Sequence, residues 1–381
     1  MRPAPPGSHA ARPAGANRVA IRPAGVRIVS SFEATGLDEC RWNALASRGT
    51  NSVFQTYQWH RSWWHAYGSQ HEPLFVTVSD GHQTTGVAPL YAADTTTGAR
   101  VVRFAGNGRA DYCDLLAGDD VNTIAAMVAG LRDYVNWDVL DLGGLPSRSP
   151  SVSMLASLCE QAGLSVMVRD QFVCPTLLVR GHEGAAQRIL NKPSLRRRHN
   201  YFVRTGQLHF RDLRAAAAIA PYLEAFFEQH AARWSGTDTP SLFAEAANRA
   251  FFRELVSRLD GTGWLLFSVV EFDGRPIAFH YGFDYNDALI WYKPSFDPAF
   301  AARSPGLVLV RHLIRRVLED GLRELDFTIG DEPFKRRFAN ELRKTVSLLV
   351  FRSRARYAYE RSRQGVVSAV RRAVSAARGQ H

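Results

Sequence analysis

A segment near the C-terminal end of the chain combines residues that could bind an anion. Residues 304–306 (Ser-Pro-Gly) follow a strand-like stretch and begin a helix-like one. Serine is a common N-cap residue, and proline suits the first helical position, where its missing N–H would be unpaired. The free N–H groups of Gly306, Leu307 and Val308 would lie at the positive end of the helix dipole, and Arg303 adds a full charge. This pattern predicts a diphosphate site, although a well-capped helix without a ligand would share it.

The elements that must position this site occur in an order that the chain uses twice. In the second half, strands over residues 264–272, 276–284, 288–292 and 324–327 accompany a helix over residues 304–320. The first half has the same order, β-α-α-β-β-β-α-β-α-β. This repetition predicts two tandem α/β domains of similar topology.

A local repeat supports this division. Asp141 lies in the stretch WDVLDLGG, and Asp326 lies in the stretch RELDFTIG, 185 positions later. The expected segments are a disordered basic leader, an N-terminal domain, a basic helical linker, a C-terminal domain and an Arg-rich tail, over residues 1–26, 27–180, 181–206, 207–352 and 353–381 respectively.

At the anion site the chain resembles the GNAT acyltransferase superfamily. Arg303-x-x-Gly306-x-Val308 resembles its acetyl-CoA signature, Gln/Arg-x-x-Gly-x-Gly/Ala, between the fourth strand and the third helix. Val308 replaces the usual small residue. Residues 304–306 together with residues 325–338 (LDFTIGDEPFKRRF) further resemble the CelD/BcsL-like group of tandem GNAT proteins, which is similar in architecture to the FemAB peptidyltransferases.

Three further stretches fit this group: residues 59–64 (WHRSWW), 111–114 (DYCD) and 230–234 (HAARW). The likeness covers residues 27–352. It implies two tandem GNAT-like domains, each a mixed, mostly antiparallel twisted sheet flanked by helices, with acyl-CoA bound by the second.

The resemblance implies acetyl-CoA, or another acyl-CoA, as the co-substrate, with no metal. The residues expected to contact it are Trp291, Tyr292, Arg303, Ser304, Gly306, Leu307, Val308 and Lys335. Backbone N–H groups near Trp291 and Tyr292 are the expected donors to the thioester carbonyl. Phe334 stands where the family often has a tyrosine that could protonate the leaving thiolate. Lys335 either reaches a phosphate or the acceptor, or is a solvated lysine on a short helix.

Two residues are candidates for the general base that acyl transfer requires. His280 lies on the strand beside the fourth strand, and imidazole titrates in a suitable range. It could equally be a core histidine packed between Phe279 and Tyr281. Asp326, on the fifth strand beside the expected cleft, is the second candidate, and it could instead cap the following turn.

The acceptor is expected to contact His230, Arg233 and Trp234, which follow the first helix of the second domain, where GNAT-like folds usually admit the acceptor. A tryptophan there could stack on a sugar or another flat ligand, or simply fill the core. The aromatic stripe over residues 59–67 is expected to be core.

The first domain is not expected to hold CoA. Asp119 and Asp120 precede its corresponding helix, and carboxylates at a helix N-terminus bind the free N–H groups and repel phosphate. We expect this domain to help build the acceptor cleft instead.

Basic residues concentrate at the ends of the chain. The net charge is +11, yet residues 1–27 carry +5 and residues 352–381 carry +7, which leaves −1 for residues 28–351. A specific nucleic-acid partner is therefore not expected. The basic stretch over residues 192–204 could hold a phosphorylated acceptor or an RNA backbone, or be a solvated helix between the domains. The Arg-rich tail could contact an anionic membrane surface, although its small apolar face favours a loosely ordered tail.

Composition and missing motifs exclude several other classes. No apolar run reaches the ~18 residues of a membrane span. The four cysteines form no CxxC pair, and GxxxxGK[ST], HExxH and GxSxG motifs are absent. With no secretion signal in the sequence, we expect a cytoplasmic protein, or one that is peripheral at the inner membrane face.

We therefore expect an acyltransferase that moves an acetyl or other acyl group from acyl-CoA to an amine or hydroxyl. The resemblance suggests a sugar or an envelope or exopolysaccharide precursor as the small-molecule or glycan acceptor. One alternative is a FemAB-like transferase that uses aminoacyl-tRNA, although the long coiled-coil insertion common in such proteins is missing. The other is a non-catalytic scaffold of polysaccharide synthesis. The acceptor and the oligomeric state are left open.

Overall fold

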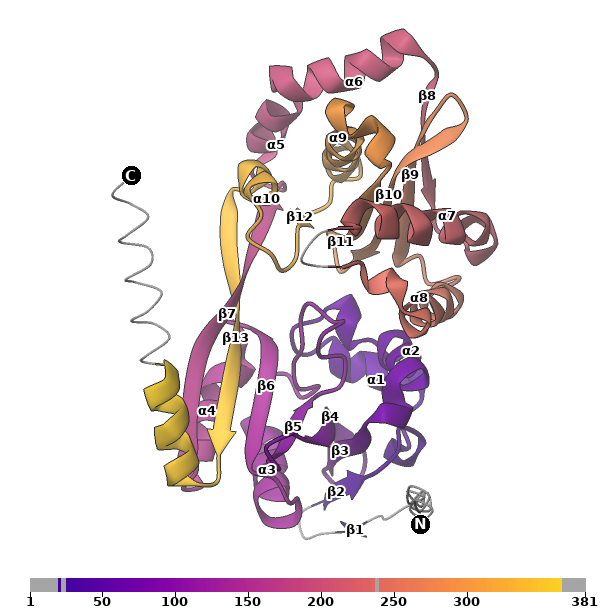
Figure 1. The fold of residues 1–381 in the computed structure, drawn as a ribbon. Coiled ribbons are helices and arrows are strands. Elements are labelled where there is room, and N and C mark those ends of the chain that lie inside the picture. Colours follow the sequence, from indigo (N-terminus) through magenta and orange to yellow (C-terminus); the bar gives the residue numbers. More distant parts are fainter. Residues whose placement is uncertain (1–19, 22–24, 237–239, 365–381) are drawn as a thin grey trace, which may run out of the picture.

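A single 13-stranded sheet runs through both halves of the protein (Figure 1). The computed structural model describes residues 20–21, 25–236 and 240–364. The strand order is β1-β2-β3-β4-β5-β6-β13-β7-β12-β11-β10-β9-β8. Neighbouring strands are antiparallel except β5 with β6 and β11 with β12, which are parallel. The two parallel pairs mark corresponding points in the two halves.

The elements of each half follow the expected order. The first half contains β1 (Ala20–Ile21), β2 (Val26–Val29), α1 (Glu39–Ala46), α2 (Tyr57–Tyr67), β3 (Glu72–Ser79), β4 (Thr84–Asp94), β5 (Arg100–Phe104), α3 (Val121–Tyr134), β6 (Val139–Pro146), α4 (Pro150–Gln161) and β7 (Ser165–Leu178). The second half contains α5 (Glu183–Leu190), α6 (Pro193–Thr205), β8 (Leu208–Leu213), α7 (Ala216–Trp234), α8 (Ala246–Arg258), β9 (Leu265–Phe272), β10 (Arg275–Tyr285), β11 (Ala288–Phe296), η6 (Pro298–Arg303), α9 (Pro305–Glu319), β12 (Glu324–Asp326), α10 (Pro333–Phe338) and β13 (Glu341–Phe351). Short 3-10 turns η2 (Glu33–Thr35), η3 (Val53–Gln55), η4 (Gly68–Gln70) and η5 (Leu242–Ala244) complete the set.

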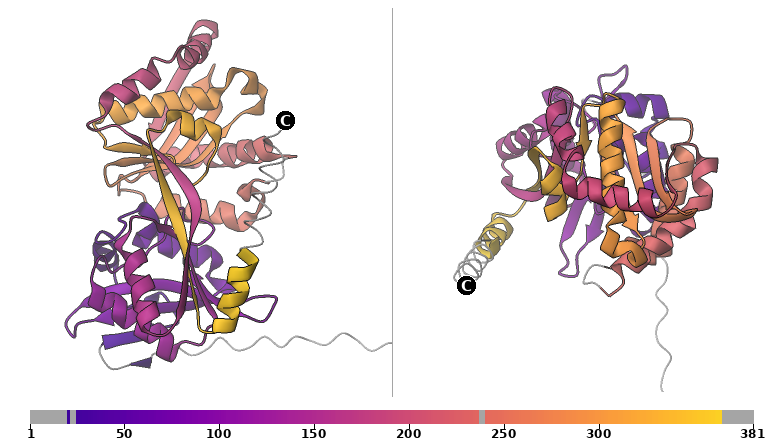
Figure 2. Two further views of the ribbon diagram at one scale, coloured as in Figure 1. Left: turned by 90° about the vertical axis from the view of Figure 1, so that its left-hand side faces the viewer. Right: turned by 90° about the horizontal axis from the view of Figure 1, so that it is seen from above.

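Each half completes its sheet with a strand of the other half. β13, the last strand of the chain, lies between β6 and β7, so that Leu348 pairs with Leu142 on one side and Val168 on the other. In return, the end of β7 enters the second half, where Thr176 pairs with Asp326 of β12. The two long strands cross between the halves in Figures 1 and 2. Neither half therefore has a complete sheet alone.

The strands of the second half are covered by helices on both faces. Along β9, Leu266 and Val270 pack into the same core as α9, whereas Phe267 and Val269 pack into the core that contains residues of α7 and α8. This burial on both faces explains why β9 is almost continuously apolar rather than alternating. α9 buries the face that carries its apolar residues at helical spacing and leaves its arginines outside.

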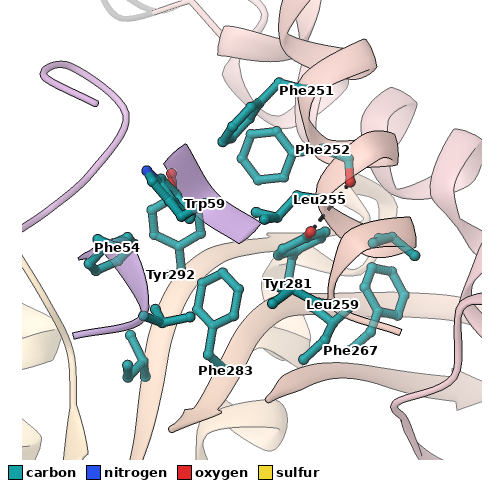
Figure 3. Packing of buried hydrophobic residues seen from close by; sticks show 14 of the residues in the cluster. Phe54, Trp59, Phe251, Phe252, Leu255, Leu259, Phe267, Tyr281, Phe283 and Tyr292 are labelled. Carbon is teal, nitrogen blue, oxygen red and sulfur yellow. Dashed lines mark hydrogen bonds between the residues drawn. The ribbon is translucent and has the colours of Figure 1, made fainter. Parts of the chain in front are cut away.

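An aromatic core joins the two halves (Figure 3). Phe54 and Trp59 of the first half lie against Phe283 and Tyr292 of the second, with ring centroids 5.3–6.2 Å apart. Aromatic contacts of this kind carry much of a core's burial energy. The expectation that the stripe over residues 59–67 is core is thus confirmed, and this core fixes the halves relative to each other.

The two ends of the chain fall partly outside the described residues. The expected leader lies largely outside them, and within it Ala20–Ile21 forms the short strand β1 against β2. Residues 354–364, expected as part of a loosely ordered tail, are helical, and Tyr357 contacts Phe351 at 5.7 Å. The rest of the tail, residues 365–381, lies outside the described residues.

Candidate functional site

A pocket opens where β11 and β12 separate. The two strands pair from Ala288 with Glu324 to Ile290 with Asp326, and β12 then ends. Beyond that point the Thr328 hydroxyl donates a hydrogen bond to the carbonyl oxygen of Trp291 at 3.0 Å. The resulting cavity has a volume of about 670 Å³, within the usual range of ligand sites. It lies between the end of α7, β11, the start of α9 and α10.

Most of the residues expected to bind a ligand line this one pocket. They are His230, Arg233, Trp234, Trp291, Tyr292, Ser304, Gly306, Leu307 and Lys335. They come from α7, β11, α9 and α10, which are far apart in the sequence. The fold therefore brings these predicted residues together around one cavity, and their ligand-binding role stays a prediction.

The start of α9 differs in detail from the expected N-cap. Ser304 holds the N-cap position, but its backbone is left-handed (φ 56°, ψ 59°) and its side chain makes no capping hydrogen bond. Its carbonyl oxygen instead accepts a hydrogen bond from the N–H of Leu307 at 3.0 Å. A Cβ built on Gly306 would meet only Phe296, at 3.5 Å, an ordinary contact. The glycine is thus not required by the protein's own packing, and its missing side chain leaves room on the pocket side.

Two of the expected ligand residues do not line the pocket. The guanidinium of Arg303 lies 4.2 Å from the ring centroid of Tyr201 on α6, on the outer surface. Val308 is 1% exposed and packs into the core beneath α9, because the second residue after Gly306 faces inward on this helix. The apolar residue at the third signature position is therefore explained by packing.

His280 is a core residue, which corrects its expected place at the cleft. Its side chain is fully buried and stacks on Trp291 with ring centroids 5.1 Å apart. Burial lowers the pKa of His280 to about 3. A Cβ on Gly282 would overlap the imidazole ring, so that glycine makes space for it. His280 supports the pocket wall from behind and does not reach the cavity.

Asp326 also lies outside the main pocket. It lines a second cavity of about 270 Å³ between the halves, together with Asn51, Tyr112 and Arg343. Its carboxylate accepts a hydrogen bond from the Thr328 N–H at 2.8 Å. Burial raises the pKa of Asp326 to about 6.

Three charged residues to which sequence analysis gave no role line the pocket: Asp111, Lys293 and Glu332. Asp111, from the first half, is 5% exposed and lines the pocket beside Thr328 and Lys293. Burial raises the pKa of Asp111, and the charge of Lys293 opposes that rise. The Lys293 ammonium lies 3.9 Å from the ring centroid of Tyr292, and burial lowers the pKa of Lys293. Thr328 has φ 53°, a costly conformation for a β-branched residue.

A signal for one of these residues was present in the sequence. The chain has only four lysines against 43 arginines, and two of the four, Lys293 and Lys335, line the pocket. Lysine is a compact, titratable charge, so its rare use in an Arg-rich chain marks positions worth testing. Asp111 lies in a polar loop, and no local pattern in the sequence shows that this loop contacts the second half.

The loop that carries Asp111 is fixed on the second half at two points. The Tyr292 hydroxyl donates a hydrogen bond to the carbonyl oxygen of Arg109 at 2.6 Å. The Arg109 side chain donates to Asn248 of α8 at 2.8 Å. On the other side of Asp111, the Tyr112 hydroxyl donates to Asp326. These contacts hold the carboxylate of one half in the pocket of the other.

The residues expected to contact the acceptor form one end of the pocket. The His230 Nδ1 atom lies 2.7 Å from the Ser241 hydroxyl, and burial lowers the pKa of His230 to about 3. The Arg233 guanidinium stacks on Phe296 at 4.3 Å and on Trp234 at 5.3 Å, and burial lowers its pKa. A neutral imidazole and a stacked guanidinium favour binding roles over proton transfer here.

At the other end, Lys335 is held in place by the loop before α10. Its ammonium donates to the carbonyl oxygen of Ile329 at 2.7 Å and lies 3.2 Å from the carboxylate of Glu332. Gly330 has φ 130°, and a Cβ there would overlap both of these side chains. Lys335 is 5% exposed and is therefore not a solvated surface lysine.

The corresponding helix of the first half, α3, begins differently. The Asp120 carboxylate accepts hydrogen bonds from the N–H groups of Asn122 and Thr123 at the beginning of α3, at 3.0 and 3.2 Å. The groups that would bind a phosphate there are already occupied by a carboxylate.

The comparisons with known proteins agree with this geometry. Residues 191–336 match the acetyltransferase (GNAT) domain family. No curated protein matches the chain by sequence. Among solved structures, FemX is 9% identical with a TM-score of 0.58, over 82% of this chain and 96% of FemX.

Two further structures are similar over most of the chain. The C-terminal domain of a putative lysylphosphatidylglycerol synthetase from Agrobacterium fabrum is 13% identical, with a TM-score of 0.53, over 86% of this chain and 95% of that domain. L-PGS from Bacillus licheniformis is 11% identical, with a TM-score of 0.50, over 84% and 92%. At these identities the likeness defines the fold. The protein is an α/β protein of two tandem GNAT-like halves. Residues 191–336, which match the acetyltransferase (GNAT) domain family, supply most of the residues that line the pocket. Across the described residues, no helix is long and apolar enough to cross a bilayer.

Proposed function

We propose that the protein transfers an acyl group, acetyl in the simplest case, from acyl-CoA to an amine or hydroxyl of an acceptor. The observation that carries this proposal is the convergence, in one pocket, of the start of α9, the fork between β11 and β12, and the buried carboxylate of Asp111. The match of residues 191–336 to an acetyltransferase domain supports it.

The pocket fits acyl-CoA in three respects. Ser304, Gly306 and Leu307 at the start of α9 line it, near the positive end of the helix dipole, and Gly306 leaves space for a diphosphate. Trp291, Phe296 and Phe334 give apolar walls for an extended thiol arm. Backbone groups of β11 beyond Ile290 have no strand partner on the β12 side, so they are placed to meet the thioester carbonyl.

Asp111 is the proposed general base. During transfer the acceptor's nitrogen or oxygen bonds to the acyl carbon, the carbon–sulfur bond breaks, and the acceptor's proton passes to the Asp111 carboxylate. The sulfur leaves as the thiolate of CoA. Burial raises the pKa of Asp111, which makes the carboxylate a stronger base, and the charge of the neighbouring Lys293 opposes that rise.

Asp326 takes a positioning role in this scheme. It does not line the main pocket, but its carboxylate holds Tyr112, the neighbour of Asp111, and the N–H of Thr328. The acceptor end of the pocket combines Trp234, Arg233 and Ser241. An aromatic face with polar groups around it suits a sugar-containing acceptor. The resemblance to the CelD/BcsL-like group supports an envelope or exopolysaccharide precursor.

Thiol release tests this proposal. Acetyl-CoA is incubated with a panel of amino sugars, sugars and their nucleotide conjugates, and the free thiol is followed for wild type, Asp111→Asn and the exposed control Asp119→Asn. The proposal predicts acceptor-dependent thiol release that falls about 10²–10⁴-fold in Asp111→Asn and is unchanged in the control. Equal rates in all three proteins would remove Asp111 as the base.

One observation favours a second candidate. Several arginines of α6 have no acidic partner in the described part of the chain, and an aminoacyl-tRNA donor would present phosphates to such a surface. The second candidate is therefore an aminoacyl transferase with an RNA-borne acyl group.

A further inference from the structure

α6 packs on the outer side of α9 (Figures 1 and 2). Six arginines without a carboxylate partner in the described residues form a cluster along this contact. We call this cluster the α6–α9 seam. Its members are Arg196, Arg197 and Arg204 on α6, Arg303 at the end of η6, and Arg311 and Arg315 on α9. Within the described ranges, no carboxylate forms an ion pair with any of them.

The positive charges of the seam repel one another. Burial lowers the pKa of Arg311, and the charges of Arg315 and Arg196 lower it further. The buried Nε atom of Arg311 has no hydrogen-bond partner among the described residues. By contrast, Arg316 on the same helix pairs with Asp212 at 2.9 Å and Asp320 at 2.8 Å. Unpaired cations held together against their mutual repulsion are typical of anion-binding sites.

A shallow groove of about 510 Å³ follows the outer side of α6 within the seam. Arg196, Arg197 and Arg204 line it together with Tyr201. From Arg196 to Arg204 the helix rises about 12 Å, enough for more than one phosphate group. Tyr201 offers an aromatic ring between the cations, a combination that suits nucleotides, since bases stack and phosphates pair with guanidinium groups.

The groove begins at the rim of the main pocket. Arg303 stacks on Tyr201 at 4.2 Å, and the next residue, Ser304, lines the pocket. A donor whose acyl group lies at the fork between β11 and β12, and whose diphosphate lies at the start of α9, would therefore extend toward the seam.

We propose that the α6–α9 seam binds phosphate groups in the ribonucleotide part of the acyl donor. The inference rests on the proposed function for its donor pocket and adds the site that recognises the donor's far end. Ribonucleotide phosphate could come from two sources: the 3′-phosphate of CoA, or the phosphodiester chain of an acylated RNA.

A triple variant, Arg196→Gln/Arg204→Gln/Arg303→Gln, tests the seam. All three residues are exposed, and their neutralisation relieves repulsion, so thermal unfolding should show a protein at least as stable as wild type. The matched control, Arg41→Gln/Arg132→Gln/Arg253→Gln, removes the same charge from exposed arginines that each pair with a carboxylate elsewhere.

Three probes are titrated into each protein: acetyl-CoA, 3′-dephospho-acetyl-CoA, and a 12-nucleotide single-stranded RNA at 50 and 200 mM salt. If CoA is the source, wild type prefers acetyl-CoA over the dephospho form by about tenfold, and the triple variant loses this preference. If RNA is the source, wild type binds RNA in a salt-dependent manner and the triple variant loses that binding. The control should behave as wild type in both cases.

The opposite results are equally clear. If the triple variant and wild type bind all three probes alike, the seam is not a phosphate site and the inference is overturned. If wild type binds neither form of acetyl-CoA, the CoA-based function fails, and the seam inference then stands or falls on the RNA titration alone.

Discussion

The hydroxyl of Tyr112 lies 2.9 and 3.0 Å from the two carboxylate oxygens of Asp326 and donates a shared hydrogen bond to them. This contact joins a loop of the first half to β12 of the second. Asp111 precedes Tyr112, and Thr328 follows Asp326 by two residues. The hydrogen bond between Tyr112 and Asp326 therefore helps to position Asp111 and Thr328 in the main pocket. The pocket is thus assembled from both halves.

Replacement of Asp326 should change how stability depends on pH. Its pKa of about 6 lies above the ordinary value near 3.8, so the protonated form is favoured in the folded state. The stability that this gives is fully present below about pH 4 and is lost as the pH rises through 6. Asp326→Asn should therefore gain about 2 kcal/mol relative to wild type between pH 4.5 and pH 7.5. Urea unfolding at both pH values measures this, and parallel pH profiles would contradict it.

His280 should show the opposite dependence. Its pKa of about 3 lies below the ordinary value of 6.5, so it contributes stability that is present above pH 6.5 and is lost as the pH falls toward 3. His280→Leu removes this titration, so the variant should lose less stability than wild type on going from pH 7.5 to pH 5. Acetyl-CoA binding at pH 7.5 should be unchanged, because the imidazole lies outside the pocket. A folded variant that no longer binds acetyl-CoA would contradict this account.

Gly306→Ala should preserve the fold. Its Cβ would meet only Phe296 at 3.5 Å, and alanine favours the helix by up to ~1 kcal/mol. We expect a melting temperature equal to or above that of wild type, together with roughly tenfold weaker acetyl-CoA binding, because the methyl group enters the space proposed for the diphosphate. A destabilised variant would show instead that the glycine serves packing.

The strand exchange predicts a single unfolding unit. Leu348 of β13 is fully buried between β6 and β7, so Leu348→Ala should cost about 2–5 kcal/mol. Both halves should lose stability together, since β13 follows the second half in sequence but pairs with β6 and β7 of the first half. Tryptophan fluorescence, to which tryptophans of both halves contribute, and far-ultraviolet circular dichroism should give one coincident transition. Two separated transitions would contradict the exchange.

Local sequence patterns predicted most of the fold correctly. The strands expected over residues 264–272 and 276–284 and the helix expected over residues 304–320 follow from patterns that act within a few residues. The exchange of β7 and β13 was not predictable in this way. Pairing such as that of Leu348 with Val168 joins residues 180 positions apart, and no local period encodes it.

In the site, too, local patterns were predictable from the sequence and contacts between distant residues were not. The residues around 304–306 form a contiguous signature, and Ser304, Gly306 and Leu307 line the pocket. The core position of His280 depends on two residues: Gly282 leaves space for the imidazole ring, and Trp291 stacks on it. Asp111 reaches the pocket only through the contacts of its loop with the other half, so its place follows from tertiary structure alone.

The central claim is that the pocket at the start of α9 binds an acyl-CoA. Isothermal titration of acetyl-CoA into wild type and Gly306→Glu tests it most directly, with Gly306→Ala as the variant that retains the fold. The account predicts micromolar binding by wild type, weaker binding by the alanine variant and none by the glutamate variant, whose carboxylate would occupy the diphosphate position. If wild type produces no heat with acetyl-CoA, or if Gly306→Glu binds it as wild type does, the claim is contradicted.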